Sequence, residues 1–174
     1  MINKKYYCFF VVVLCLVISN LNVYGCEWGY YYDYRIEGQT SLLQESKYEF
    51  NSEDIEEKIY ELFANLVAIN YNENRYNLIN KDVDIKSVYF DKGKLEVSFS
   101  KEVLNYGGTM WETDMIDQFL STFFSVEEVE SISFYINRET TLFVEGTEIV
   151  DFNRNQLKGR LKRDNENRNR KVEY

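Results

Sequence analysis

The feature that most constrains the fold is a change of hydrophobic period within residues 85–152. Apolar and polar residues alternate on both sides of the turn Asp91-Lys92-Gly93, a pattern that predicts a strand hairpin. After Gly107-Gly108 the apolar residues recur at the spacing of a helix, at Ile116, Phe119, Leu120 and Phe123. Alternation then returns at Ile132, Phe134 and Ile136. A hairpin, a helix and a further strand are therefore predicted in this order, with a return strand over residues 142–144.

The predicted helix has a start signal of its own. Thr109 and Glu112 form a T-x-x-E pattern directly after the two glycines, which predicts a capping box. Glu112, Asp114 and Asp117 fall largely off the apolar stripe, and the helix is expected to pack on a sheet through that stripe.

The preceding part of the chain predicts a second hairpin and a second helix. Residues 28–34 and 42–50 read as strands around a turn at residues 37–39, and packing on a sheet is favoured for their tyrosines over stacking on carbohydrate. Asn51 or Ser52 can cap the helix that follows. Its buried face is predicted from Ile55, Ile59, Leu62, Phe63 and Leu66.

The N-terminus has the three parts of an export signal. Lys4 and Lys5 precede an apolar run over residues 6–18, and Val23-Tyr24-Gly25-Cys26 resembles a lipobox with an unusual Tyr24. We expect a lipoprotein-type signal peptide over residues 1–25, lipidation of Cys26 at a lipid-anchor start (26–27), and a protein held on the outer surface of the cell membrane. Simple cleavage after Gly25, giving a secreted protein, and a retained N-terminal anchor are the alternatives.

Charge is distributed unevenly along the chain. Residues 27–153 contain 26 Asp or Glu and 10 Lys or Arg, whereas residues 154–174 contain 3 and 8. Nucleic acid is therefore not expected as a partner, because its recognition depends on basic groups that neutralise phosphates. The basic segment 154–174 is predicted to be a disordered tail in which Leu157 and Leu161 allow a short helical extension.

The chain has no histidine. This excludes Ser-His and Cys-His nucleophiles and zinc sites built on imidazole, and no cofactor or metal is expected. Catalysis by carboxylates alone, as in glycoside hydrolysis, stays open, with Glu112, Asp114 and Asp117 as candidates. A protein without enzymatic activity is the favoured interpretation.

Residues 88–146 resemble the C-terminal half of the GerMN domain of sporulation and spore germination proteins. The resemblance rests on the hairpin, the run from Lys101 to Gly108, a helix with Thr122 near its end, and the turn at Glu145-Gly146. A fainter likeness extends over residues 28–153. It implies an α+β fold similar to ring-building motifs, with two helices on one face of a mixed or antiparallel sheet in the order ββαββαββ, as a single small domain.

The resemblance also implies a non-enzymatic module for protein interaction or envelope assembly. Its partners would be envelope proteins of unknown identity, a homo-oligomer is possible, and a module that binds a cell-wall polymer is the alternative. Tyr106, Trp111 and the sheet edge are the candidate interaction surfaces. For Trp111 itself, however, a buried side chain that completes the core is the favoured interpretation.

Overall fold

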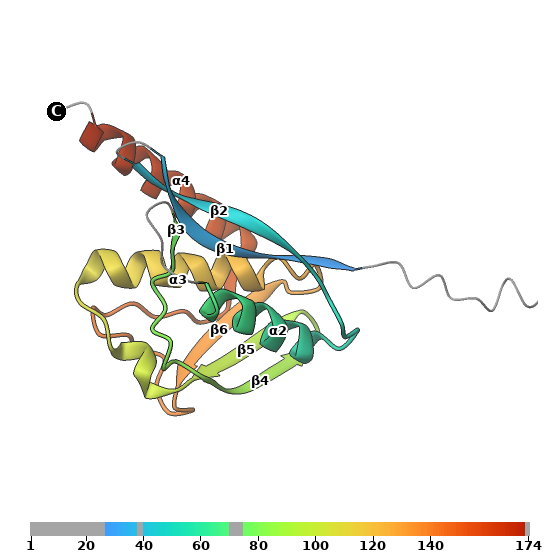
Figure 1. Ribbon diagram of the computed structural model, residues 1–174. Helices are drawn as coiled ribbons and strands as arrows, with labels where there is room; N and C mark the ends of the chain where they lie inside the picture. The colour runs from blue at the N-terminus through green and yellow to red at the C-terminus, as the bar shows by residue number, and fades with distance from the viewer. Residues whose placement is uncertain (1–26, 38–39, 70–74, 173–174) are drawn as a thin grey trace, which may run out of the picture.

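The computed structural model describes residues 27–37, 40–69 and 75–172, which form two sheets and the helices that pack between and beside them (Figure 1). In chain order the elements are β1 (Trp28–Glu37), β2 (Thr40–Glu49), α2 (Ile55–Val67), β3 (Arg75–Tyr76), β4 (Ile85–Asp91), β5 (Lys94–Phe99), the 3-10 helix η1 (Lys101–Leu104), α3 (Thr109–Phe123), β6 (Ser131–Ile136), β7 (Phe152–Asn153) and α4 (Arg154–Val172). The predicted α+β class and the predicted order of the two helices among the strands are confirmed.

The larger sheet has the strand order β4-β5-β6-β7. The antiparallel hairpin of β4 and β5 is the one predicted, and Lys92 and Gly93 both have positive φ in its turn, as a type I′ turn requires. β5 and β6 are parallel, and α3 makes the crossover between them. The predicted strand over residues 142–144 is not formed as such, because its place is taken by single bridges such as Leu142 with Glu148.

Helices α2 and α3 cover one face of this sheet, as predicted. The core between them is aromatic: the rings of Phe99 and Phe119 lie 4.5 Å apart, and Phe63, Phe123 and Phe134 pack around them. All of these side chains are buried. The N-cap of α2 is Asp54, whose carboxylate accepts a hydrogen bond from the Glu57 amide. The prediction that Asn51 or Ser52 caps this helix is therefore wrong.

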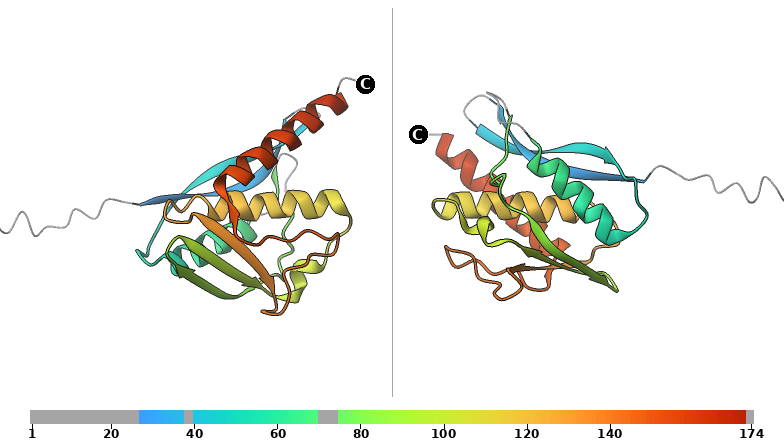
Figure 2. Two further views of the ribbon diagram at one scale, coloured as in Figure 1. Left: turned by 180° about the vertical axis from the view of Figure 1, so that it is seen from behind. Right: turned by 60° about the horizontal axis from the view of Figure 1, so that its bottom comes forward.

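The β1–β2 hairpin does not join this sheet. It forms a separate sheet, with the order β2-β1-β3, on the opposite side of the helices, so that the molecule has three layers (Figures 1 and 2). Side chains of α3, and of Ser125 just after it, bind the backbone of β1. The Tyr30 amide donates to Ser125 Oγ at 2.9 Å and the Tyr32 amide to Thr122 Oγ1 at 3.1 Å, while Gln118 Nε2 donates to the Tyr32 carbonyl. These side chains therefore provide the hydrogen bonds that a neighbouring strand would otherwise make to β1 at Tyr30 and Tyr32.

The tail is the largest departure from the sequence-based expectation, because residues 154–172 form helix α4. Asn153 Oδ1 accepts from the amides of Asn155 and Gln156, while Gln156 Oε1 accepts from the Asn153 amide, which is a reciprocal capping box. Leu157 is buried against the core. The capping box and the buried Leu157 therefore stabilise the beginning of the basic segment as a helix.

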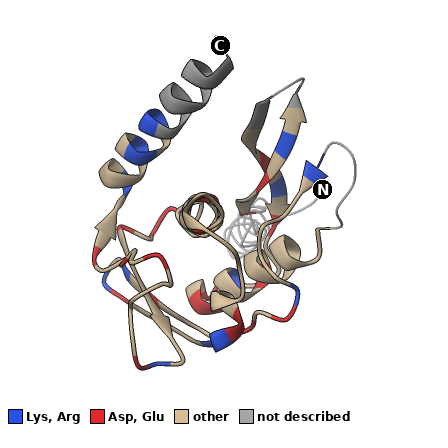
Figure 3. Cartoon of the chain, turned by 90° about the vertical axis from the view of Figure 1, so that its left-hand side faces the viewer, with Lys and Arg blue, Asp and Glu red and all other residues tan. Residues whose placement is uncertain are grey.

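Arg154 joins the beginning of α4 to the end of α3. Its guanidinium donates to the carbonyls of Phe124, Val126, Glu127 and Val129, which follow the last turn of α3. The Phe124 carbonyl belongs to the C-cap of α3, so a positive donor at this position gives it a hydrogen bond and also offsets the helix dipole. Figure 3 shows α4, with several basic residues, along one side of a body that carries most of the acidic ones.

Candidate functional site

The predicted capping box at the start of α3 is not formed. Gly108 is the N-cap, and no side chain there accepts a cap hydrogen bond. Glu112 is instead buried, and its carboxylate accepts from the amides of Glu145, at 2.7 Å, and Thr147, at 3.2 Å, and from the Tyr106 hydroxyl. We call this arrangement the Glu112 clip. It ties the connection between β6 and β7 to the beginning of α3.

The clip is electrostatically consistent with an ionised carboxylate. Burial alone would raise the pKa of Glu112, but the hydrogen bonds from Thr147, Tyr106 and Glu145 outweigh burial and lower the pKa below its ordinary value. Burial, together with the hydrogen bond to Glu112, raises the pKa of Tyr106, whose oxygen also accepts from the Val144 amide. Tyr106 is thus a half-buried structural partner as well as a surface residue.

Trp111 is not part of the core. It is 43% exposed, and its indole Nε1 donates to the Leu78 carbonyl at 2.8 Å, which fixes the ring while leaving much of it in solvent. Beside it in the first turn of α3, Met110 is 67% exposed, and Val144, whose amide donates to Tyr106, is 58% exposed. We call Tyr106, Met110, Trp111 and Val144 the Trp111 surface.

Sequence reasoning named two members of this surface and missed the other two. Met110 carries a weak signal, since it is an apolar residue off the core stripe of its helix. Val144 carries none, because its segment is brought to the beginning of α3 by contacts between residues far apart in the sequence. These are the Glu112 clip and the hydrogen bond from Thr109 Oγ1 to the Glu145 carboxylate. Exposed apolar side chains that gather on a soluble domain often mark a binding surface.

The three candidate catalytic carboxylates lie off the apolar stripe of α3 but do not face solvent. Glu112, Asp114 and Asp117 are all buried, because α3 is covered by the hairpin and by α4 as well as by the larger sheet (Figure 2). Asp117 forms an ion pair with Arg160 of α4, and Glu112 belongs to the clip. Their arrangement supports a structural role for Glu112 and Asp117.

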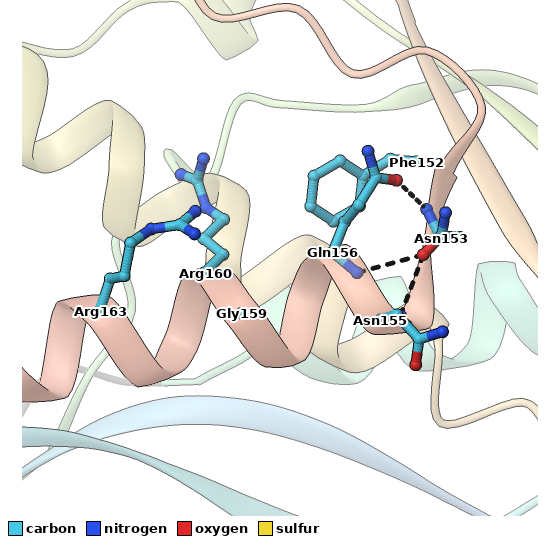
Figure 4. A pocket seen from close by; sticks show the side chains of 7 residues that line it. All are labelled: Phe152, Asn153, Asn155, Gln156, Gly159, Arg160 and Arg163. Carbon is cyan, nitrogen blue, oxygen red and sulfur yellow. Dashed lines mark hydrogen bonds between the residues drawn. The ribbon is translucent and has the colours of Figure 1, made fainter.

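A hollow of about 500 Å³ lies along α4, between Phe152 and Arg163 (Figure 4). Most of the polar groups in its lining already have partners: Asn153 and Gln156 cap the helix, and Arg160 binds Asp117. The attachment of α4 to the body accounts for these groups without a ligand.

The described residues contain neither a candidate metal site nor a candidate membrane-spanning helix. Within the part of the chain that the structure describes, no three His, Cys, Asp or Glu side chains are placed to hold a metal ion. The described helices include none that is both long and apolar enough to cross a membrane. The predicted lipidation site Cys26 lies outside the described residues.

Comparison with solved structures shows the same fold in three chains of low sequence identity. The first GerMN domain of the sporulation protein GerM from Bacillus subtilis has a TM-score of 0.59 at 17% identity, covering 74% of this chain and 98% of that one. The tandem GerMN domains of the same protein have a TM-score of 0.60 at 11% identity, covering 76% of this chain and 47% of that one. The chain thus spans about half of the tandem structure.

The third structure, from Clostridium perfringens, is described as a "Putative Lipoprotein" and has a TM-score of 0.52 at 14% identity, covering 76% of this chain and 91% of that one. No curated protein matches the chain. The sequence model of the Germane family, described as sporulation and spore germination, matches residues 30–142. This match extends from the hairpin through α3 and β6, and the chain therefore belongs to the Germane family of sporulation and spore germination proteins.

Proposed function

We propose that this chain is a non-enzymatic lipoprotein of the cell envelope that binds a protein partner through the Trp111 surface. The observation that carries the proposal is the exposure of Met110, Trp111 and Val144 around the beginning of a helix that is otherwise buried. The clip and the indole hydrogen bond hold these residues in place. An exposed apolar surface on a rigid frame lowers the entropy that is lost on binding.

The chemistry of the partner follows from the charge around this surface. Glu139, Glu145 and Glu148 are exposed in the segment that the clip holds, and residues 27–153 have a net charge of −16. An acidic partner would be repelled. The fitting partner is a protein with an apolar centre and a neutral or basic rim.

Variants of exposed residues test this proposal without disturbing the core. Met110→Ser removes an apolar side chain that has no hydrogen bond of its own, so we expect an unchanged melting temperature and a clear loss of the partner from chemical cross-links made in intact cells. Val150→Ser is the matched control, because Val150 is 52% exposed and lies outside the Trp111 surface. Equal cross-linking of the wild type and Met110→Ser would contradict the proposed surface.

The lipid anchor is proposed from residues 23–26, and the structural neighbour from Clostridium perfringens is itself described as a lipoprotein. Mass spectrometry of the mature N-terminus is expected to find acylated Cys26, and Cys26→Ser is expected to release the protein from the membrane fraction. A mature N-terminus without acyl chains would contradict the anchor but leave the interaction proposal standing.

A further inference from the structure

The outward face of the larger sheet, opposite the helices, carries a second hollow of about 290 Å³. We call it the Tyr89 hollow, and it is lined by Ser87, Tyr89, Glu96, Ser98, Tyr135 and Arg138. Three neighbouring strands and the turn after β6 contribute these residues. None of the side chains in the lining is aliphatic.

The strand register fixes where the two aromatic rings lie. Tyr89 of β4 is opposite Glu96 of β5, and Tyr135 of β6 is beside Ser98 of β5. The tyrosines are therefore placed diagonally across β5. The standard spacing between strands and the standard rise per residue put their Cα atoms about 12 Å from each other. Tyr89 is 57% exposed, and Tyr135 is half-buried.

Arg138 closes one end of the hollow and is held there. Its backbone amide donates to Ser98 Oγ at 2.9 Å, and its guanidinium donates to Ser87 Oγ at 3.2 Å and to the Lys86 carbonyl at 2.9 Å. A guanidinium has five N–H donors, so donors remain for a ligand after these contacts.

Besides the two serines that hold Arg138, the hollow has three polar side chains, those of Tyr89, Glu96 and Tyr135. Among the described residues, no hydrogen bond or ion pair involves the Glu96 carboxylate or the hydroxyls of Tyr89 and Tyr135. This distinguishes the hollow from the one along α4, whose groups cap that helix and bind α3. An acceptor, two aromatic rings and a fixed donor thus face one open space without partners from the described part of the chain.

We propose that the Tyr89 hollow binds a neutral glycan, that is, a chain of uncharged, hydroxyl-bearing sugar rings. The C–H faces of such rings pack on tyrosine, while their hydroxyls donate to Glu96 and accept from Arg138. A protein partner would require an apolar centre, which this hollow lacks. A polyanion would meet the repulsion of the acidic body, whereas Glu96 and Arg138 balance each other within the hollow.

The position of the hollow leaves it accessible when the N-terminus is tethered. The described chain begins at β1, in the hairpin layer, and the helices separate that layer from the larger sheet (Figure 1). This inference goes beyond the proposed protein interaction and uses none of the residues of the Trp111 surface.

Calorimetric titration of the full chain in detergent tests the proposal, with the N-acetylglucosamine tetramer and maltotetraose as neutral probes and polyphosphate as a polyanion. We expect saturable binding of at least one neutral oligosaccharide. Tyr89→Ala is expected to weaken this binding about tenfold and Glu96→Gln to weaken it measurably, while Tyr89→Phe, which keeps the ring, stays within about threefold of the wild type.

Val150→Ser is the control and is expected to bind like the wild type, since Val150 does not line the hollow. Both Tyr89 and Glu96 are exposed, so unchanged melting temperatures are expected for their variants. The proposal is overturned if neither oligosaccharide binds, if Tyr89→Ala and Glu96→Gln both bind like the wild type, or if only polyphosphate binds. Loss of a cross-linked protein on Tyr89→Ala, without sugar binding, would assign the hollow to a protein instead.

Discussion

Glu112 is the residue on which the arrangement around the beginning of α3 depends. Its buried carboxylate accepts hydrogen bonds from two backbone amides and from the Tyr106 hydroxyl. Hydrogen bonds to an ionised group are stronger than neutral ones, and a buried donor that loses its acceptor retains the full cost of desolvation. The clip therefore stabilises the fold and also positions Val144 on the Trp111 surface.

We predict that Glu112→Gln lowers the free energy of unfolding by about 1–3 kcal/mol at pH 7, because the neutral amide replaces one of the two acceptor oxygens with a donor. Urea denaturation of the wild type and the variant measures the difference. Glu139→Gln, which changes an exposed carboxylate, is the control and is expected to leave stability almost unchanged. Equal midpoints for Glu112→Gln and the wild type would show that the clip is not stabilising.

The pH dependence of this difference has a definite sign. The folded pKa of Glu112 is lowered, so its contribution is fully present above the unfolded value of about 4.3 and is lost as the pH falls through the lower folded pKa. The stability gap between the wild type and Glu112→Gln is expected to stay constant from about pH 7 to 5 and to narrow below about pH 4. Denaturation curves across this range would refute the assignment if the gap widened in acid.

At the scale of elements, α3 is a central helix that contacts a different layer on each side. Its apolar stripe packs on the larger sheet, while its Gln118 and Thr122 side chains bind the backbone of β1, as does Ser125 just after the helix. Replacing the Thr122 hydroxyl leaves the Tyr32 amide without its acceptor. We predict that Thr122→Val destabilises the fold by about 1–3 kcal/mol in chemical denaturation.

Ser121 provides the matched control for this experiment. It is buried on the same helix, but its hydroxyl has no hydrogen-bond partner among the described residues. Ser121→Ala is therefore expected to be neutral or stabilising, since it removes a buried polar group that has no compensating bond. Destabilisation by Ser121→Ala equal to that of Thr122→Val would contradict the bonding role of Thr122.

The two capping patterns of the chain give a further prediction at this scale. Asn153→Ala removes an observed N-cap and is expected to weaken α4 by about 1 kcal/mol, seen as faster hydrogen exchange of the amides at its beginning. Thr109→Ala, at the predicted but absent box, is expected to leave α3 unchanged. The opposite order of effects would contradict this assignment of the caps.

The sequence predicted those features that depend on local spacing. The hairpin of β4 and β5, the core stripe of α3 and the strand β6 follow from hydrophobic period. The separate hairpin layer, the clip and the attachment of α4 could not be predicted, because the contacts that define them join residues far apart in the sequence. The pairs Tyr32–Thr122, Glu112–Glu145 and Val126–Arg154 are all 28 or more positions apart. Trp111 could be named as a candidate from its position at the start of the predicted helix. Val144 could not, because long-range contacts place its segment there.

At the scale of the whole molecule, buried polar contacts hold the layers together and leave two distinct surfaces outside. The Trp111 surface is apolar and lies around the beginning of α3, whereas the Tyr89 hollow is polar and aromatic and lies on the outer face of the larger sheet. The Germane family is one of sporulation and spore germination, and the proposed binding role within it requires no active site.

Site-specific photo-cross-linking in intact cells tests the central claim most directly. A photoreactive amino acid is placed at Met110 in one strain and at Val150 in another, since both positions are more than half exposed. The proposed interaction predicts a discrete protein adduct from position 110 and none from position 150. No adduct from position 110, or the same adduct from both positions, would contradict it.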